Sequence, residues 1–450
     1  MRSLYGLKNR GKILLPRLEA GRQLYNACLG EALRRWQQVA QSKAYQAAKA
    51  MPHQTEEERV SGSKAFSNAR QAHYFSDFGL QMYALELRRN WIGGHLDAFA
   101  AQKLATRAFA AVEKIAMGKA RKDRFKGKNQ MDTMEGKSNK TGIRWRNNVV
   151  EWMGLILPGL INTKDPVVAH GLSCRVKYVR LVRRKMNGKN RFCAQLVLEG
   201  EPHRKLNSDG SLKHPLGQGT VGLEAGPSTL AAVGEKEAML SPFCGELVPQ
   251  AREIRRLQRK LDRSRRANNP DNYNPNGTVK KGPKKWVESK NYRAARTQLM
   301  DLHRRLAAHR KSLQGRLVNK VLAFGDTFLH EDVSISGWQR RSGRSVGFRA
   351  PGKFFSILKR KAESAGGRAI SFPTRTTALS QVCHCGNRTK KKLSERWHRC
   401  LACSAVAQKD LYSAFLARFV EPVAVEEAKI EWRLNAGRAV DAWSPGVPAA

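Results

Sequence analysis

Lysine and arginine outnumber aspartate and glutamate by 83 to 37 in this chain, which leaves a formal net charge of +46 at pH 7. Self-repulsion on that scale opposes any compact state unless a polyanion neutralises it. Hydrophobic residues still make up 41% of the 450 positions, so the chain can build cores, and this argues against a disordered basic tail. We therefore expect a nucleic-acid-binding protein of roughly two to four domains.

The sequence contains no apolar run of about 18 residues, so it predicts no membrane span. Its first residues, Met1–Lys8, lack the apolar stretch of a secretory signal, and we expect a cytoplasmic protein. Eight cysteines are too few for a disulfide scaffold. Four of them are scattered singly and are interpreted as small buried hydrophobic residues: Cys28, Cys174, Cys193 and Cys244. The oligomeric state stays open.

The first part of the chain has the pattern of packed helices. Residues 1–20 are basic, and we expect them to be extended. From Gly21 to about Lys119 the apolar residues recur at helical spacing, and Pro52 with the Glu56–Glu58 run separates two helices. Basic residues stand between the apolar ones, which predicts helices with one packed face and one nucleic-acid-facing face. A bundle with solvated lysines is the alternative.

Strands are predicted farther along, after a Lys/Arg/Gly-rich stretch at 121–141 that lacks periodicity. Alternating residues predict strands at Ile143–Met153, Ser173–Val182 and Arg191–Leu198, and Asn187-Gly188 predicts a hairpin turn between the last two. The simplest interpretation is a small β-barrel or sheet. The segment Glu201–Gly219, with two prolines and three glycines, is interpreted as a linker and as the main domain boundary.

Strands and helices mix in the second half, which predicts an α/β domain. Two long basic helices, Gln250–Ala267 and Ser289–Leu322, flank an exposed tip at Asn268–Lys285, and an irregular Trp/Arg/Gly segment follows residue 333. The other expected elements are strands at Thr220–Glu224, Thr229–Val233, Thr327–Val333 and Ala369–Phe372, and helices at about Lys353–Ala365 and Gln408–Val420.

Three acidic residues stand at the ends of these elements. Glu224 and Glu331 each end an apolar strand, and Asp410 opens a helix. Carboxylates at the ends of buried strands are unfavourable unless a cation binds them. Carboxylates that converge from several elements suit Mg²⁺, and a pair of such ions can clamp the attacking and leaving oxygens of a phosphodiester. The alternative is two strand-end turn acids and one helix acid favoured by the macrodipole.

Four cysteines fall within 21 residues near the C-terminus: Cys383, Cys385, Cys400 and Cys403. The second pair has the two-residue gap of a zinc ribbon, whereas one residue separates the first pair. His384 or His398 can replace a sulfur if the geometry demands it. We expect a structural Zn²⁺, because four protein ligands leave no open position for substrate.

The second half, over roughly residues 216–420, resembles the transposon-encoded TnpB proteins and the compact type V CRISPR effectors related to them. The segments that look like the three RuvC motifs and the opening of the family's zinc finger are Val221–Gly226 with Ser228–Ala231, His330–Val333, Asp410–Ala414, and Ser380–Gly386. The order of acid, basic helical hairpin, acid, zinc finger and acid also agrees. Over residues 1–215 the resemblance rests only on layout.

The resemblance implies an RNA-guided DNA binder of a prokaryote, with a guide RNA and target double-stranded DNA as partners. It implies an α+β multidomain protein with a helical recognition lobe and a β-barrel wedge domain, followed by a ribonuclease H-like RuvC domain with an inserted zinc finger. Glu224, Glu331 and Asp410 would be the acids that bind Mg²⁺. The implied bounds are 1–20 and 120–215 for the wedge domain, 21–119 for the recognition domain, 216–375 with 404–450 for RuvC, and 376–403 for the zinc finger.

This chain departs from the family's motifs at two places. Glu224 stands where the first motif has Asp, and Tyr412 and Ser413 replace Asn and Ala of the third. The extra methylene shifts a carboxylate by about 1 Å, a displacement that can cost roughly 10²-fold in rate. We hypothesise weak or absent cleavage and action mainly by guided binding. The alternatives are an active RuvC endonuclease in CRISPR antiviral defence or a transposon, and a non-guided RNA-binding zinc-ribbon protein.

Two segments interleave aromatic and basic residues in the manner of single-strand stacking platforms. They are the run Arg144, Trp145 and Arg146, and the group Trp338, Arg340 and Arg341. We expect them to contact nucleic acid. Core tryptophans beside surface arginines are the alternative.

Overall fold

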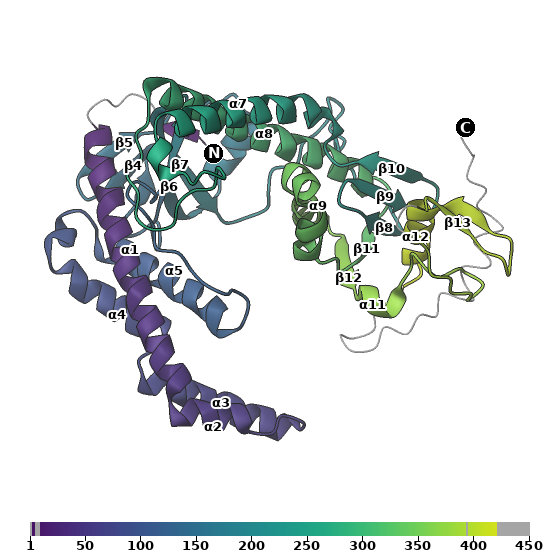
Figure 1. Cartoon of the computed structure of the whole chain (residues 1–450), viewed down its shortest axis with the longest axis horizontal. Coiled ribbons are helices and arrows are strands. Elements are labelled where there is room, and N and C mark those ends of the chain that lie inside the picture. Colours follow the sequence, from purple (N-terminus) through teal and green to yellow (C-terminus); the bar gives the residue numbers. More distant parts are fainter. Residues whose placement is uncertain (1, 5–9, 393–394, 421–450) are drawn as a thin grey trace. The chain divides into compact units, whose positions relative to one another are not determined.

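The computed structural model describes residues 2–4, 10–392 and 395–420 (Figure 1). The chain divides into two compact units, residues 1–203 and 204–450, and the division falls in the segment 201–219 that we interpreted as a linker. Residues 421–450 of the expected RuvC-like domain lie outside the described residues. Within the described part of the chain, no helix is both long and apolar enough to cross a membrane.

Helices dominate the first part of unit one, as the periodicity predicts. They are α1 (Arg10–Gln41), α2 (Lys43–Ala50), α3 (Glu56–Ala72), α4 (Asp77–Arg88), the short 3₁₀ helix η1 (Trp91–Gly94) and α5 (Ala98–Ala116). The expectation of an extended segment up to residue 20 was wrong from Arg10 onward. Leu14, Leu18 and Tyr25 are buried on α1 at helical spacing, so the apolar stripe begins before the predicted start. The predicted break at Pro52 is confirmed, and Thr55 with Glu58 forms a capping box on α3.

The strands of unit one form two antiparallel sheets. One has the order β1 (Arg2–Leu4), β7 (Lys189–Leu198), β6 (Val176–Met186) and β2 (Thr133–Glu135); the other has β3 (Arg144–Arg146), β4 (Val149–Trp152) and β5 (Leu155–Pro158). The helix α6 (Pro166–Ser173) precedes β6. The described strands thus form two open sheets and not the closed barrel that the family resemblance implied.

Turn chemistry explains where these strands end. Asn187 and Gly188 both have positive φ, 49° and 74°, so the predicted hairpin between β6 and β7 is confirmed. A second turn was missed, because Asn147 and Asn148 also have positive φ and split the single strand expected over 143–153. Asparagine tolerates this left-handed region better than most residues.

A buried polar junction ties the helices of unit one to the second sheet. Asp97 caps α5 by accepting from the Ala100 N–H at 2.9 Å, and it also accepts from Trp152 Nε1 at 2.6 Å. Arg17 Nη1 donates to the Trp152 carbonyl at 2.7 Å, and its guanidinium lies 4.7 Å from the Trp152 ring centroid. Three distant segments therefore share one hydrogen-bonded cluster.

Unit two is built on a five-stranded mixed sheet with the order β10 (Ala238–Pro242), β9 (Thr229–Val233), β8 (Thr220–Ala225), β11 (Thr327–Glu331) and β12 (Arg368–Phe372). The first three strands are antiparallel, and β11 is parallel to both β8 and β12. Helix α12 (Lys409–Ala417) packs on one face (Figure 1), and α8 (Lys290–Leu322) and α10 (Pro351–Ser364) pack on the other.

Side-chain alternation in the central strands separates these two layers. Val221, Leu223 and Phe328 belong to the core with α8 and α10. Leu329 belongs to the core with α12. Because successive strand residues point to opposite faces, Gly222 and Glu224 face the α12 layer.

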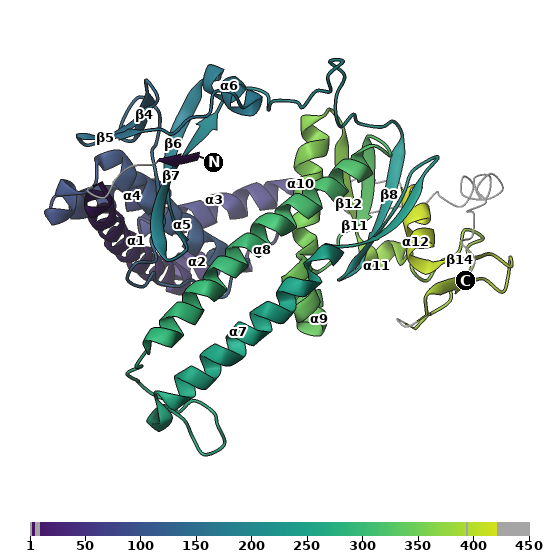
Figure 2. The same cartoon turned by 90° about the horizontal axis from the view of Figure 1, so that it is seen from above.

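A helical hairpin of α7 (Val248–Ala267) and α8 joins β10 to β11 (Figure 2), with the short turns η2 (Gly245–Leu247) and η3 (Pro270–Asn272) beside it. At its tip Asn269 accepts from the Val287 N–H at 2.6 Å and donates to the Val287 carbonyl at 3.0 Å. This reciprocal pair closes the base of the exposed tip loop that the sequence predicted.

The segment after β11 is helical, so our expectation of an irregular stretch there was wrong. Helix α9 (Ile335–Arg349) begins at Ser334, whose hydroxyl accepts from the Gly337 N–H, and it breaks at Ser342. Its buried Val346 anchors it despite three internal glycines. The remaining elements are α11 (Thr374–Thr377), β13 (Trp397–Arg399) and β14 (Val406–Gln408).

Candidate functional site

The parallel pairing of β8 and β11 brings two of the predicted acids to the same edge of the sheet. Leu223 pairs with His330, so Glu224 and Glu331 occupy the next row of the register. Neighbouring strands lie about 4.8 Å apart, and residues in one row point to the same face. In open sheets with parallel strands, ligands bind outside the carboxyl ends of the strands.

Helix α12 supplies the third acid from above this edge. Asp410 lies in its first turn. The pKa of Glu224 is raised well above its usual value by burial, and next by the charges of Glu331 and Asp410, while Lys409 opposes the rise. Protein atoms crowd Glu224 although part of its side chain remains accessible to solvent. Glu331 and Asp410 therefore both lie near enough to Glu224 for their charges to act on its carboxyl group.

Glu331 is the least solvent-exposed of the three, with 9% of its surface exposed. Burial raises the pKa of its carboxyl group. Thr377 on α11, itself 1% exposed, donates its hydroxyl to Glu331 Oε1 at 3.4 Å. No local sequence pattern predicts this contact, because Thr377 lies 46 residues away in a four-residue helix.

The donor set at this edge fits a hard divalent cation. Carboxylate oxygens are the ligands that Mg²⁺ prefers, and a bound cation would relieve the mutual repulsion that raises the pKa of Glu224. Glu224, Glu331 and Asp410 would hold it. Among the described residues, the cysteine cluster is the only group of three or more side chains already close enough together to hold a metal ion, and the three carboxylates do not form such a group.

The four cysteines predicted as zinc ligands form that cluster. Cys383 Sγ lies 3.5 Å from Cys403 Sγ, and Cys385 Sγ lies 3.6 Å from Cys400 Sγ. A tetrahedral site with Zn–S bonds of about 2.3 Å places its sulfurs about 3.8 Å apart, so the cluster fits this metal. Burial by itself would raise the pKa of the Cys400 thiol. The backbone N–H groups of Cys403 and Ala402 and the neighbouring thiols outweigh it and lower this pKa to about 6.

The two histidines that we kept as alternative ligands belong to a different set of contacts. His384 Nδ1 lies 2.7 Å from the Tyr412 hydroxyl. The His398 ring packs against the Tyr412 ring at 4.1 Å, and its Nδ1 is hydrogen-bonded to Lys391. The sulfur cluster therefore comprises all four cysteines and neither histidine.

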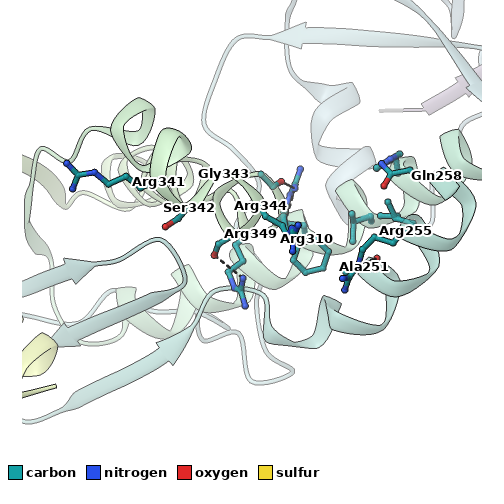
Figure 3. Close-up of a pocket in the computed structure, with 15 residues that line it drawn as sticks. Ala251, Arg255, Gln258, Arg310, Arg341, Ser342, Gly343, Arg344 and Arg349 are labelled. Atoms are coloured by element: carbon teal, nitrogen blue, oxygen red, sulfur yellow. Dashed lines mark hydrogen bonds between the residues drawn. The ribbon is translucent and has the colours of Figure 1, made fainter. Parts of the chain in front are cut away.

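An arginine-lined groove of about 1090 Å³ lies between α7, α8 and α9 (Figure 3). Its basic lining residues are Arg255, His303, Arg310, Arg341, Arg344 and Arg349, and no acidic residue among those that the structure describes lines it. Ile254, Leu306 and Phe348 give it an apolar floor. Such a surface suits a phosphodiester backbone, which needs cations and little base readout.

Two of the groove arginines are engaged in holding the groove together. Arg310 Nη1 donates to the carbonyls of Gly347 and Phe348 at 3.0 and 3.1 Å, and Arg349 Nη1 donates to Ser345 Oγ at 3.0 Å. In Figure 3, the Arg341 guanidinium points away from the other labelled arginines. Arg255 and Arg344 are exposed and are the groove's best candidates for anion contacts.

Of the residues predicted to contact nucleic acid, Arg341 lines this groove. Arg341 and Trp338 also line a second hollow together with Asp332 and Thr374, beside the strand end that carries Glu331. Arg340 is exposed on α9. The groove residues Arg255, Arg310, Arg344 and Arg349 were missed, although the basic character of the two long helices was noted.

The run at 144–146 has a structural environment of its own. Arg144 forms an ion pair with Glu151 at 3.0 Å, and Trp145 packs against the hydrophobic core of unit one. Trp145 Cη2 would lie 2.6 Å from a Cβ placed on Gly159. Arg146 is exposed. Trp145 is thus partly buried between two arginines, and contact of this run with nucleic acid stays a prediction.

No protein-family model matches this chain, and neither does any curated protein. Among solved structures it is similar to one titled "Cryo-EM structure of the Cas12f1-sgRNA-target DNA complex". The match covers 90% of this chain and 82% of that chain, with 11% sequence identity and a TM-score of 0.49. At this identity the likeness concerns the backbone arrangement alone.

Proposed function

We propose that this protein is an RNA-guided DNA-binding effector of the compact type V kind, with a guide RNA and target double-stranded DNA as partners. The observation that supports it best is that Glu331 and Asp410 lie near enough to Glu224 to raise its pKa, while the three acids come from three elements in the order of the RuvC motifs. A plain RNA-binding protein has no need of such a set of acids. The net charge of +46 supplies the cations that backbone binding requires.

In this proposal the protein binds nucleic acid chiefly through phosphates. Base pairing between guide and target carries the sequence information, so the protein needs a basic surface of fixed shape. The groove between α7, α8 and α9 offers one, with Arg255 and Arg344 exposed to solvent and Arg310 and Arg349 holding the walls. The zinc ribbon has a structural role.

We propose further that the RuvC-like site cleaves weakly or not at all. Mg²⁺, when bound by the three acids, would supply the charge that stabilises a phosphodiester in transfer. The Glu224 side chain is one methylene longer than the usual Asp, so its carboxylate would sit about 1 Å away from the productive position. Crowding on the α12 face, where Gly222 touches Ala414, leaves little room for the chain to compensate.

Guided binding and weak cleavage are tested together. Sequencing of the RNA that copurifies with the protein should find a discrete species. A plasmid assay with purified protein, guide RNA and Mg²⁺ should show guide-dependent binding of matched DNA and little cleavage, with Glu224→Asp raising the cleavage rate. Robust cleavage that Glu224→Ala abolishes would establish the alternative of an active endonuclease. A random mixture of copurifying RNA, with no guide-dependent binding, would favour the non-guided RNA-binding protein.

The groove's part in binding has its own test, which uses adjacent arginines on one helix. Arg255 lines the groove, whereas Arg256 is paired with Glu253 at 2.7 Å. We expect Arg255→Gln and Arg344→Gln each to weaken binding at all sequences and to lower the slope of log K against log salt by about 1. Arg256→Gln should change neither quantity. Equal effects of Arg255→Gln and Arg256→Gln would show that only total charge matters.

A further inference from the structure

Tyr412 lies on α12 two residues after Asp410, at a position where the resembling family has Asn. It is 4% exposed, although α12 packs on the sheet through its other side. Its hydroxyl points toward Cys383 and His384, in the segment that carries the four cysteines and is called the zinc ribbon here. This departure from the motif therefore has a structural use of its own.

Three groups surround the Tyr412 hydroxyl, and all belong to the ribbon. Cys383 Sγ lies at 3.3 Å, the His384 N–H donates to the oxygen at 3.0 Å, and His384 Nδ1 lies at 2.7 Å. A phenol has one proton and two lone pairs. If Cys383 is a metal-bound thiolate, the phenol donates to sulfur, and the His384 backbone and Nδ1–H both donate to the oxygen. The phenol proton and both lone pairs of the Tyr412 oxygen are then used.

The Tyr412 ring continues the contact. The His398 ring lies 4.1 Å away at an interplanar angle of 32°, and the Phe415 ring stacks at 6.3 Å on the helix side. His398 is 3% exposed and stands on β13, the first strand of the ribbon. Both the polar and the apolar part of Tyr412 are thus enclosed between the ribbon and α12.

The opposite side of α12 is fixed to the sheet. A Cβ on Gly222 would lie 1.9 Å from the Ala414 carbonyl oxygen, and Arg418 Nε donates to the Thr220 carbonyl at 3.1 Å. Gly222 is two residues from Glu224. Contacts therefore run without a gap from the sulfur cluster through Tyr412 and α12 to the strand that carries Glu224.

We propose that Tyr412 is a positioning residue that couples occupancy of the zinc site to the placement of α12, and through it of Asp410. The hydrogen bond to Cys383 holds the metal-bound form of the ribbon against the helix. Partners of this kind around metal ligands typically change metal affinity by about 10–100-fold when removed. The inference goes beyond guided binding and does not depend on it.

The test uses the full-length, zinc-loaded protein and the variant Tyr412→Phe. We expect the variant to lose zinc to a chelator about tenfold faster than the wild type, and its α12 amides to exchange hydrogen faster even with zinc bound. With Co²⁺ in place of zinc, the thiolate-to-metal absorption band should shift, because Cys383 has lost a hydrogen bond. Phe415→Leu, a packing change on the same helix, should speed exchange without shifting the band.

An unchanged cobalt band together with an unchanged rate of zinc loss in Tyr412→Phe would overturn the proposal. If that variant does not fold, the wild type decides. Removal of zinc should then speed exchange in α12 while leaving α10, on the far face of the sheet, as it was. Equal exchange in α12 with and without zinc would also overturn the proposal. None of these readouts requires guide RNA, target DNA or cleavage.

Discussion

The Ala414 carbonyl oxygen occupies the space that any side chain on Gly222 would need, since a Cβ there would lie 1.9 Å away. Strand β8 and helix α12 therefore touch backbone to backbone, two residues from Glu224. The contact explains why the strand carries a glycine between two buried apolar residues, Val221 and Leu223. It also sets how far Asp410 lies from the edge of the sheet.

Gly222→Ala should destabilise unit two by about 1–3 kcal/mol or more, because overpacking forces the helix away from the sheet. Urea unfolding measures the change. The matched control is Gly315→Ala in α8, where a Cβ meets nothing within 4 Å and helix propensity favours alanine by about 1 kcal/mol. If both variants changed the unfolding free energy alike, α12 would not pack on β8 as described.

Glu224→Gln should stabilise the protein in the absence of divalent cations. It replaces a carboxyl group whose pKa is raised first by burial and next by the charges of Glu331 and Asp410. We expect a gain of about 2–4 °C in melting temperature, which corresponds to about 1 kcal/mol in a domain of this size. Mg²⁺ should stabilise the wild type more than the variant, since the variant has lost a ligand.

Thermal denaturation with and without Mg²⁺ checks this expectation. Glu237→Gln, at an exposed position in the turn between β9 and β10, is the control and should leave both melting temperatures in place. A loss of stability in Glu224→Gln under both conditions would mean that the three carboxylates do not repel one another.

Asp97→Ala should cost unit one about 2–4 kcal/mol. The variant loses the N-cap of α5, which is worth about 1 kcal/mol, and leaves the buried Trp152 N–H without its acceptor, which costs about 1–3 kcal/mol more. Thr55→Ala removes an exposed cap on α3 and should cost only about 1 kcal/mol. Chemical denaturation measures both losses of stability. If the two variants lost the same amount, Asp97 would act only as the N-cap of α5 and its hydrogen bond with Trp152 would not contribute.

Glu31→Gln should lower stability in a pH-dependent way. Hydrogen bonds from Arg34 and Arg35 outweigh burial and lower the pKa of Glu31 from 4.5 to about 2. The stabilisation is therefore fully present above about pH 4.5, the unfolded value, and is lost as the pH falls toward the folded value. The stability difference between wild type and variant should shrink on going from about pH 7 to about pH 3.

Urea unfolding at several pH values measures that difference. Glu86→Gln on α4, at an exposed position, is the control and should show no comparable trend. If the stability difference between wild type and variant stayed constant across this pH range, Glu31 would not be stabilised in its charged form by Arg34 and Arg35.

Local patterns were sufficient to predict the strands and helices that carry the acids. Glu224 and Glu331 stood out because each ends a short apolar run in a chain with few acids, and period-two alternation is a property of neighbouring residues. The hairpin at Asn187-Gly188 was predictable for the same reason, since the turn type depends on two adjacent residues.

Contacts between distant segments were not predictable in this way. Nothing near Thr377 marks it as a partner of Glu331, and no spacing shows that Tyr412 meets Cys383, 29 residues earlier. The histidines stayed open as ligands because spacing alone allows them, whereas the folded ribbon directs both toward Tyr412. Helix α9 was missed because its glycines lower helix propensity, and burial of Val346 overrides that preference.

The pair of hydrogen bonds between Asn269 and Val287 has a practical consequence for engineering. It closes the base of the tip loop, and the hydrophobic core between α7 and α8 is formed by residues outside that loop, among them Ile254, Leu302 and Leu306. A foreign peptide or a fluorescent label grafted into that loop should leave the sheet and its acids undisturbed. The tip of the α7–α8 hairpin is therefore a suitable site for attaching another molecule to the protein.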